Sequence, residues 1–307
     1  MTRAIFIFIV SLLLLLPVVF YAGDIHVSYQ LIICLPFILF LGIPHGAIDN
    51  ILYLRDKKIK NSQFIIVYLC FVSANVLLWF FLPNTAYLLF LLLSAYHFGQ
   101  SQFSHYFSKQ RNAYKLLYLF WGVAILAALV HFNMKEIQQI ISEESDFAAL
   151  SQSHHEKVVL ATFLLASAGT LVALGVLSFK KRISTEALLM EYLVFALVLI
   201  SFFLLPLIIG FTLYFIILHS FKVLREEYRF LCGEQVISSV TGFIKIVAPF
   251  TAFSLAGMGF LFALIYLDFL DLSYGYCLLI VISSITLPHV FVMNKFYTYF
   301  ISAKYKP

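Results

Sequence analysis

The stretch "LIICLPFILFLGIPHGAIDN", residues 31–50, runs from a continuous apolar segment into a proline, a histidine and an aspartate. Such an apolar segment is typical of a helix that crosses a membrane, where only apolar side chains suit the lipid. Pro44, His45 and Asp49 follow it before the next basic loop begins. An ionisable side chain at that depth is costly unless it finds a partner inside a bundle. The stretch therefore predicts a membrane helix that brings polar groups into a bundle interior.

The composition of the whole chain agrees with this reading of one segment. Its 307 residues are 63% hydrophobic and only 11% charged, which lies far outside the balance of soluble domains. Apolar runs recur from end to end, each long enough to cross a hydrocarbon core of about 30 Å. The alternation typical of membrane β-barrels is absent, so helices must satisfy the backbone hydrogen bonds. We predict an all-α, polytopic transmembrane bundle in which residues 1–307 form a single integral membrane domain.

The apolar runs predict about ten spans, with eight or nine as alternatives. They lie near 4–22, 28–54, 62–81, 85–107, 114–132, 157–178, 186–204, 207–223, 240–267 and 273–294. The loops between them alternate between basic and neutral or acidic, and basic loops remain in the cytoplasm. Both termini are therefore expected to be cytoplasmic. The first run is either a retained span or a cleaved signal sequence. We favour a retained span because its apolar part is longer than a signal sequence requires.

The charges and cysteines exclude several classes of function. The net charge is +5, and the Lys and Arg residues cluster in loops where membrane topology already explains them. Nucleic-acid binding is therefore not expected. The four cysteines are scattered and form no CxxC pair, which argues against a metal site built from thiolates.

The nine histidines fall into two groups when they are placed on the predicted spans. Five lie in loops or near span ends, where a solvated or interfacial side chain is the simplest interpretation: His26, His105, His131, His154 and His155. The other four lie within spans that run from outside to inside, each a few helical turns before the next basic loop: His45, His97, His219 and His289. At similar depths in the cytoplasmic half, these four rings are expected to meet in one layer.

A layer of four neutral imidazoles suits a divalent transition metal, since imidazole binds iron, copper, zinc and nickel. A single intramembrane histidine is explained equally well by a hydrogen bond to a neighbouring helix. Asp49 lies one helical turn after His45 and is a candidate acceptor for the spare N–H of a metal-bound histidine, or a ligand itself. The alternative is that Asp49 reaches out to the membrane interface. Gln100 and Gln102 are weaker candidates for the same supporting role.

Four motifs surround the four histidines of the predicted layer: "GIPHGAID" (42–49), "SAYHFGQ" (94–100), "YFIILHS" (214–220) and "TLPHVFVMNKFY" (286–297). Together, over about residues 40–300, they resemble the Brp/Blh family of bacterial and archaeal membrane β-carotene 15,15′-dioxygenases. The resemblance implies an iron-dependent enzyme that cleaves the central 15,15′ double bond of β-carotene, or a related carotenoid, with O₂ to give retinal. It also implies a cytoplasmic membrane as the location, the lipid bilayer as a partner and an opsin as a candidate acceptor of the retinal.

The resemblance implies that His45, His97 and His219 hold Fe(II), and that His289 matches a late Pro-His motif of the family. Two positions differ from the family pattern. Many members have a histidine after the aspartate of the first motif, where this chain has Asn50, and some have a second histidine at the position of Val223. If that second histidine is a ligand in those relatives, this chain either uses His289 instead or has one ligand fewer.

Two other functions remain open from the sequence. Ionisable residues within membranes often mark ion routes, so a transporter or proton pathway is one alternative. Against it, the spans contain few acidic partners and no detectable inverted repeat. The 18% of aromatic residues suits a cavity for a long, flat, apolar molecule, although rings that simply pack together would give the same composition. Because this chain has Asn50 and Val223 where relatives have histidines, a carotenoid-binding protein without cleavage activity is the other alternative.

Overall fold

The computed structural model describes residues 3–54, 60–107, 112–153 and 155–301, and within these ranges all regular structure is helical. The α-helices are α1 (Arg3–Ala22), α2 (Val27–Phe37), α3 (Asp49–Leu54), α4 (Asn61–Phe81), α5 (Pro83–Phe103), α6 (Asn112–Phe132), α7 (Met134–Glu143), α8 (Glu156–Phe179), α9 (Thr185–Leu204), α10 (Leu207–Tyr214), α11 (Phe221–Gly233), α12 (Val240–Tyr266) and α13 (Tyr274–Lys295). The short or irregular helices are η1 (Ile38–Gly42), η2 (Ile43–Gly46), η3 (Ser104–Tyr106), η4 (Ser145–Ser153), η5 (Phe215–Ser220) and η6 (Phe296–Ile301).

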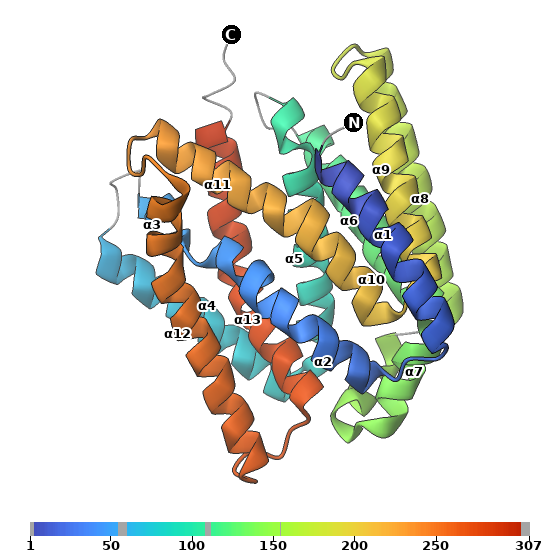
Figure 1. Cartoon of the computed structure of the whole chain (residues 1–307), viewed down its shortest axis with the longest axis vertical. Coiled ribbons are helices and arrows are strands. Elements are labelled where there is room, and N and C mark those ends of the chain that lie inside the picture. Colours follow the sequence, from blue (N-terminus) through green and yellow to red (C-terminus); the bar gives the residue numbers. More distant parts are fainter. Residues whose placement is uncertain (1–2, 55–59, 108–111, 154, 302–307) are drawn as a thin grey trace.

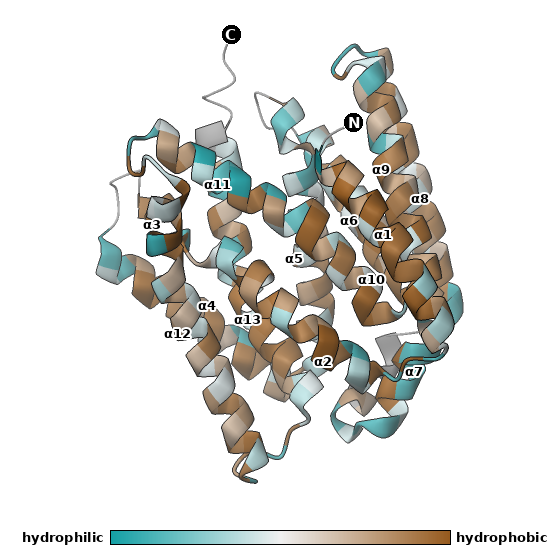
Figure 2. Ribbon diagram, viewed as in Figure 1, coloured by the Kyte–Doolittle hydropathy of each residue, from teal (hydrophilic) through white to brown (hydrophobic). Residues whose placement is uncertain are grey.

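In the described part of the chain, nine helical runs are long and apolar enough to cross a membrane. The protein is therefore a multi-pass membrane protein of the all-α class, and the apolar faces of its helices are plain in Figure 2. The remaining predicted span, 85–107, corresponds to α5, which has 21 residues. It is less apolar than the others because its last turns contain Gln100, Ser101 and Gln102. Most of the buried residues of α5 lie in this polar half.

The two ends of the bundle differ in what they contain. The start of α1 and the end of α13 lie at the same end of the bundle (Figure 1). This is the arrangement expected if α5 crosses the membrane together with the nine apolar runs of the described chain, because the number of crossings is then even. The turn between α8 and α9 also lies at that end (Figure 1). Basic loops place this end in the cytoplasm, which remains a prediction. The amphipathic helix α7 lies at the opposite end.

Helices α5 and α6 pack so closely that their backbones touch. A Cβ atom added to Gly99 would lie 2.0 Å from the Tyr118 carbonyl oxygen, and one added to Gly122 would lie 1.8 Å from the Ala95 carbonyl oxygen. Only glycine permits this approach, which is a common device for packing membrane helices. Because Gly99 lies next to Phe98 and two residues after His97, the contact fixes the position of His97.

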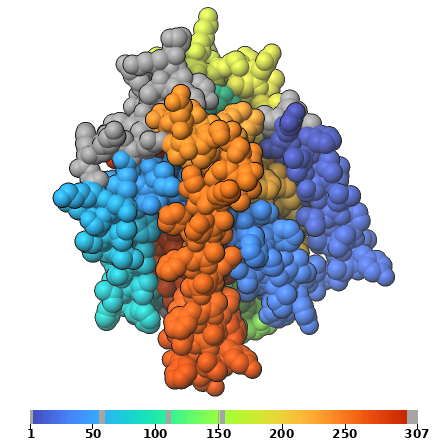
Figure 3. All heavy atoms as spheres, turned by 60° about the vertical axis from the view of Figure 1, so that its left-hand side comes forward, coloured from blue at the N-terminus to red at the C-terminus, as the bar shows by residue number. Residues whose placement is uncertain are grey.

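Other helices cover this centre. Helix α13 packs against α4 and α5. Helix α12 runs along the outside between α4 and α2, where most of its side chains are exposed (Figure 3). Serine side chains begin several of these helices. Ser184, Ser239 and Ser273 each accept a hydrogen bond from a backbone N–H in the first turn of α9, α12 and α13 respectively.

Three predicted segments differ in detail from the structure. The span predicted at 28–54 is divided into α2, the π-helix η1, the 3₁₀-helix η2 and α3. Pro44 lies in η2, where its missing N–H removes one helical hydrogen bond. The span predicted at 207–223 contains the π-helix η5 and continues as α11 to Gly233. The acidic stretch 133–156, predicted as a loop, contains α7 and η4.

Candidate metal centre

The structure brings His45, His97, His219 and His289 together inside the bundle. They come from four different elements, η2, α5, η5 and α13, and all four side chains are buried. The ring centroid of His289 lies 5.0 Å from that of His45 and 4.9 Å from that of His97. The centroid of His219 lies 4.9 Å from that of His97 and 5.2 Å from that of His45. The His45 and His97 rings are 6.3 Å apart, on opposite sides of the cluster.

Irregular helices position two of the four rings. His45 follows Pro44 in η2, directly after the π-helix η1, and His219 lies within the π-helix η5. A π-helical turn contains an extra residue, so it changes the direction in which the following side chains point; such turns often occur at functional sites. His97 and His289, in contrast, lie on the regular helices α5 and α13.

Hydrogen bonds at Nδ1 orient three of the four imidazoles. His45 donates its Nδ1–H to the carbonyl of Gly42, and His289 donates its Nδ1–H to Oδ1 of Asp49 at 2.8 Å. Ser101 donates its hydroxyl proton to the Phe98 carbonyl at 2.9 Å, so its oxygen accepts the Nδ1–H of His219 at 3.0 Å. A proton on Nδ1 leaves the lone pair of Nε2 free in a neutral imidazole.

The free nitrogens of the cluster lie close to one another. Each of His45, His97 and His289 offers a ring nitrogen, and these three atoms lie within 4.8 Å of one another. Among the described residues, no partner is found for Nε2 of His219 or His289, or for either ring nitrogen of His97. Buried polar atoms are rarely left without a partner. A divalent metal would satisfy one nitrogen of each ring, and neutral imidazole nitrogens are ligands that suit it.

Asp49 lies directly behind the cluster and supports it from one side. It is buried, and its second oxygen accepts a hydrogen bond from the Tyr68 hydroxyl at 3.2 Å. A carboxylate that accepts the spare N–H of a histidine increases the basicity of the opposite nitrogen. Gly46, next to His45, faces the His289 ring, since a Cβ there would lie in ordinary contact, 3.4 Å from Nδ1 of His289.

Aromatic rings enclose the cluster on the other side. Phe98 lies edge-on to His219 with the ring centroids 4.7 Å apart, and Phe215 packs against both His45 and His219. A Cβ on Gly42 would lie only 2.6 Å from the Phe215 ring, so glycine is needed at position 42 as well. The rings keep the immediate surroundings of the histidines apolar.

The two positions that differ from the family pattern lie near the cluster without joining it. Val223 is fully buried, one turn after His219, in a group of apolar side chains that includes Ile48 and Met293. No partner is found among the described residues for the buried side-chain oxygen of Asn50. The fourth ring of the cluster is instead His289.

The remaining candidates lie farther away. Gln100 donates a hydrogen bond to Asn294 at 3.0 Å, and Gln102 donates one to Glu191 at 2.6 Å. Of the five peripheral histidines, His26 forms an ion pair with Glu143 at the end of the bundle where α7 lies. His155 is exposed, and His154 lies outside the described residues.

Sequence reasoning missed three groups, two that bond the histidines and one that bonds Asp49. They are the Gly42 carbonyl, the Ser101 hydroxyl and, behind Asp49, the Tyr68 hydroxyl. Ser101 lies one turn after His97 on α5, so a polar residue at that spacing was the available signal. Tyr68 lies on α4 and is apart in sequence from every motif, so no local pattern marks it.

Known proteins match the part of the chain that contains the cluster. A family model described as beta-carotene 15,15'-dioxygenase matches residues 37–297, which include all four histidines and Asp49. A curated protein of that name from an uncultured marine bacterium, 66A03, is 32% identical over 75 residues, or 23% of this chain. The chain matches only 27% of the length of that relative. No solved structure matches. From the family match, which covers most of its length, the chain belongs to the beta-carotene 15,15'-dioxygenase family.

Proposed function

We propose that this protein is an iron-dependent membrane oxygenase that cleaves the central 15,15′ double bond of β-carotene, or of a related carotenoid, with O₂ to give retinal. The family match supports the reaction type and the carotenoid substrate. The convergence of buried histidines supports a metal-dependent reaction: ring nitrogens of His45, His97 and His289 lie within 4.8 Å of one another, and the His219 ring packs against those of His97 and His45. This convergence is the observation on which the proposal depends most.

Each residue of the cluster has a defined role in the proposal. His45, His97, His219 and His289 hold Fe(II), with Nε2 of His45, His219 and His289 facing the metal because their Nδ1 atoms are already bonded. Asp49 orients His289, and Ser101 orients His219. A bound Fe(II) would supply the activation of O₂, which protein side chains alone do not provide.

The protein surroundings contribute by excluding water and restricting orientation. The histidines and their aromatic neighbours are buried, so a polyene would meet them in an apolar medium. Water is therefore excluded from the reacting bond, and other reactions of the activated oxygen are suppressed. Rings such as Phe98 and Phe215 suit contact with a flat conjugated chain.

The proposed setting is the cytoplasmic membrane of a bacterium or archaeon. The substrate reaches the histidines from the lipid bilayer, in which carotenoids dissolve, and an opsin is the candidate acceptor of the retinal produced. The basic loops favour the cytoplasmic half for the histidine cluster.

The test uses β-carotene-producing cells and purified protein. His97→Ala is expected to lose both bound iron and retinal formation, whereas His155→Ala, which changes an exposed histidine, keeps both. Wild-type protein is expected to form retinal only when O₂ is supplied. Iron content is measured by elemental analysis and retinal by chromatography.

Two results would contradict the proposal. Full retinal formation by iron-free protein would exclude a metal-dependent reaction. Coloured protein that keeps its carotenoid intact under O₂, with iron bound, would indicate a carotenoid-binding protein without cleavage activity.

A further inference from the structure

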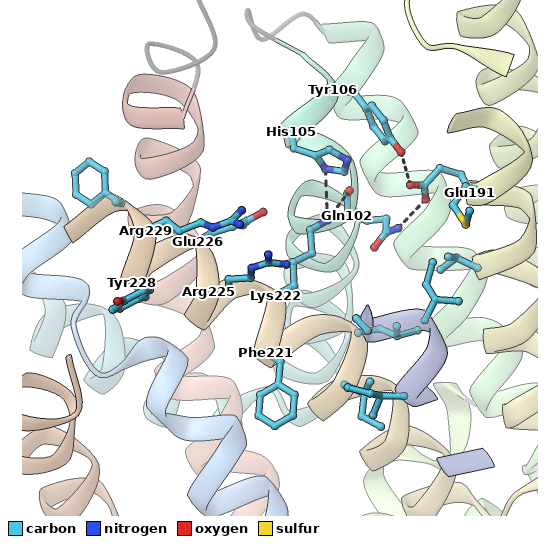
Figure 4. A pocket seen from close by; sticks show the side chains of 18 of the residues that line it. Gln102, His105, Tyr106, Glu191, Phe221, Lys222, Arg225, Glu226, Tyr228 and Arg229 are labelled. Carbon is cyan, nitrogen blue, oxygen red and sulfur yellow. Dashed lines mark hydrogen bonds between the residues drawn. The ribbon is translucent and has the colours of Figure 1, made fainter. Parts of the chain in front are cut away.

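A large cavity lies away from the histidine cluster. It has a volume of about 1,070 Å³ and lies between α1, α5 with η3, α9, η5 and α11. None of the four clustered histidines lines it. It lies toward the end of the bundle where α1 begins, the end that the basic loops place in the cytoplasm (Figures 1 and 4). Its size matches that of pockets that bind small organic ligands.

One wall of the cavity is basic. Lys222, Arg225 and Arg229 all lie on α11 and line the cavity. Their spacing of three and four residues places them on one face of the helix. Arg225 and Arg229 are exposed, whereas the Lys222 ammonium donates a hydrogen bond to the Gln102 carbonyl at 2.8 Å. Figure 4 shows this row of side chains along α11.

The two carboxylates in the cavity are already hydrogen-bonded to other side chains. Glu191 accepts hydrogen bonds from Gln102 at 2.6 Å and from Tyr106 at 2.8 Å (Figure 4). Glu226 accepts one from Tyr297 at 2.8 Å. Glu226 also interacts electrostatically with Lys222, Arg225 and Arg229, so a bound phosphate would share these cations with it. The cavity also holds one more basic than acidic side chain, with histidine left uncounted.

Another part of the lining is apolar. Ile5 and Ile7 on α1, Val194 on α9, and Ile217 and Leu218 on η5 line it. Ile7 is 47% exposed on the outer surface. Phe221, which lines the cavity beside Lys222, is 43% exposed. A ligand in this cavity therefore needs an anionic part for α11 and an apolar part for α1.

We propose that this cavity binds an anionic phospholipid of the cytoplasmic leaflet, with its phosphate against Arg225, Arg229 and Lys222 and an acyl chain along α1. Basic pockets between membrane helices on the cytoplasmic side are suited to acidic headgroups. Guanidinium groups bind phosphate through paired hydrogen bonds, which ammonium groups do not match. The bound lipid would connect α1 to α11 and so stabilise the bundle. This binding is independent of whether the protein cleaves a carotenoid.

The test measures the unfolding temperature of the full-length, detergent-purified protein as ligands are added. Dioleoyl phosphatidylglycerol is expected to raise it in a saturable way, whereas dioleoyl phosphatidylcholine, with the same chains and no net charge, is not. Inorganic phosphate is the third addition. An equal saturable rise with inorganic phosphate would mean a site for the free anion and would overturn the lipid proposal, as would equal responses to the two lipids.

Two variants test the two parts of the cavity separately. The double variant Arg225→Gln/Arg229→Gln is expected to raise the half-saturating concentration of phosphatidylglycerol about tenfold or more, since each bond to a charged group is lost. Its matched control is Lys180→Gln/Arg182→Gln, which removes two exposed charges from the turn between α8 and α9 at the same end of the bundle and leaves binding unchanged.

The apolar part is tested by Ile7→Trp, which fills space beside α1 and keeps every charge. It is expected to weaken phosphatidylglycerol binding by a similar factor. Wild-type affinity in both the arginine variant and Ile7→Trp would refute the assignment. If the arginine variant does not fold, the wild-type comparison of the two lipids and Ile7→Trp still decide the question.

Discussion

The hydrogen bond between Asp49 and His289 offers the sharpest test of how the centre is held. Asp49→Ala removes an acceptor 2.8 Å from Nδ1 of His289, where the two side chains are only 4% and 5% exposed. No water replaces the acceptor easily at that depth, so the N–H of His289 is left unpaired. An unpaired buried donor costs about 1–3 kcal/mol. The ring is also free to turn, which displaces its Nε2.

The effect is expected to depend on metal. In metal-free protein, the loss of a buried carboxylate offsets part of the cost, because a buried charge is itself unfavourable. With a cation bound, that offset disappears. Removal of a carboxylate that supports a ligating histidine typically weakens metal binding about 10–100-fold, which corresponds to about 1.4–2.7 kcal/mol. Asp49→Asn retains an acceptor oxygen without the charge and should fall between wild type and Asp49→Ala.

The assay is a chelator competition that gives the dissociation constant of Fe(II) under anaerobic conditions, together with unfolding temperatures with and without metal. Tyr68→Phe is the matched control, since it removes only the 3.2 Å hydrogen bond on the other oxygen of Asp49. It should change the constant by less than about threefold. Equal metal affinity in Asp49→Ala and wild type would refute the role assigned to Asp49.

Three further predictions concern the bundle itself. Gly99→Ala should lower the free energy of unfolding by about 3 kcal/mol or more, since its Cβ would lie 2.0 Å from a backbone oxygen of α6. Gly257→Ala, whose Cβ would have nothing within 4 Å, should not destabilise the protein. Equal unfolding temperatures for the two variants would contradict the packing of α5 on α6. Burial raises the pKa of Glu136 on α7, although its hydrogen bonds oppose the shift. The folded protein therefore favours the protonated acid, and the free energy of unfolding should fall as pH rises through the range just above the ordinary pKa of a glutamate. Glu136→Gln should flatten that part of the curve of stability against pH. A slope unchanged by the substitution would exclude Glu136 as its source. Ser283→Ala should cost about 1 kcal/mol in unfolding assays because Trp79 loses its 2.6 Å hydrogen bond, and a cost near zero would mean that Trp79 finds another acceptor.

The positions of the spans could be predicted because a membrane-crossing helix needs an apolar run of about 20 residues, which is visible in the sequence. The spans predicted at 62–81 and 157–178 correspond within a residue or two to α4 and α8. The grouping of the four histidines needed only the number of residues between each one and the next basic loop. These numbers place the four rings at a similar depth in the membrane, and in the structure neighbouring rings are in contact.

The interior of the spans could not be predicted in the same detail. Whether a turn is α or π depends on how the helix packs against its neighbours, so the sequence "YFIILHS" did not reveal η5. The acceptor Ser101 and the donor Tyr68 reach their partners only because helices distant in sequence meet face to face. The amphipathic α7 had a usable signal, in the spacing of Met134, Ile137 and Ile141, but its charges favoured a loop.

The π-helix η5 means that the orientation of His219 depends on a local count of residues. Each residue of an α-helix turns the chain by about 100°. If the wide turn became an ordinary α-helical turn without a change in length, the chain before it would keep its lipid-facing pattern, while the chain after it would rotate by about that angle. The His219 imidazole would then point away from the other three, although no polar or charged group had been lost. The orientation of His219 is therefore sensitive to substitutions that favour a regular α-helix over residues 215–220.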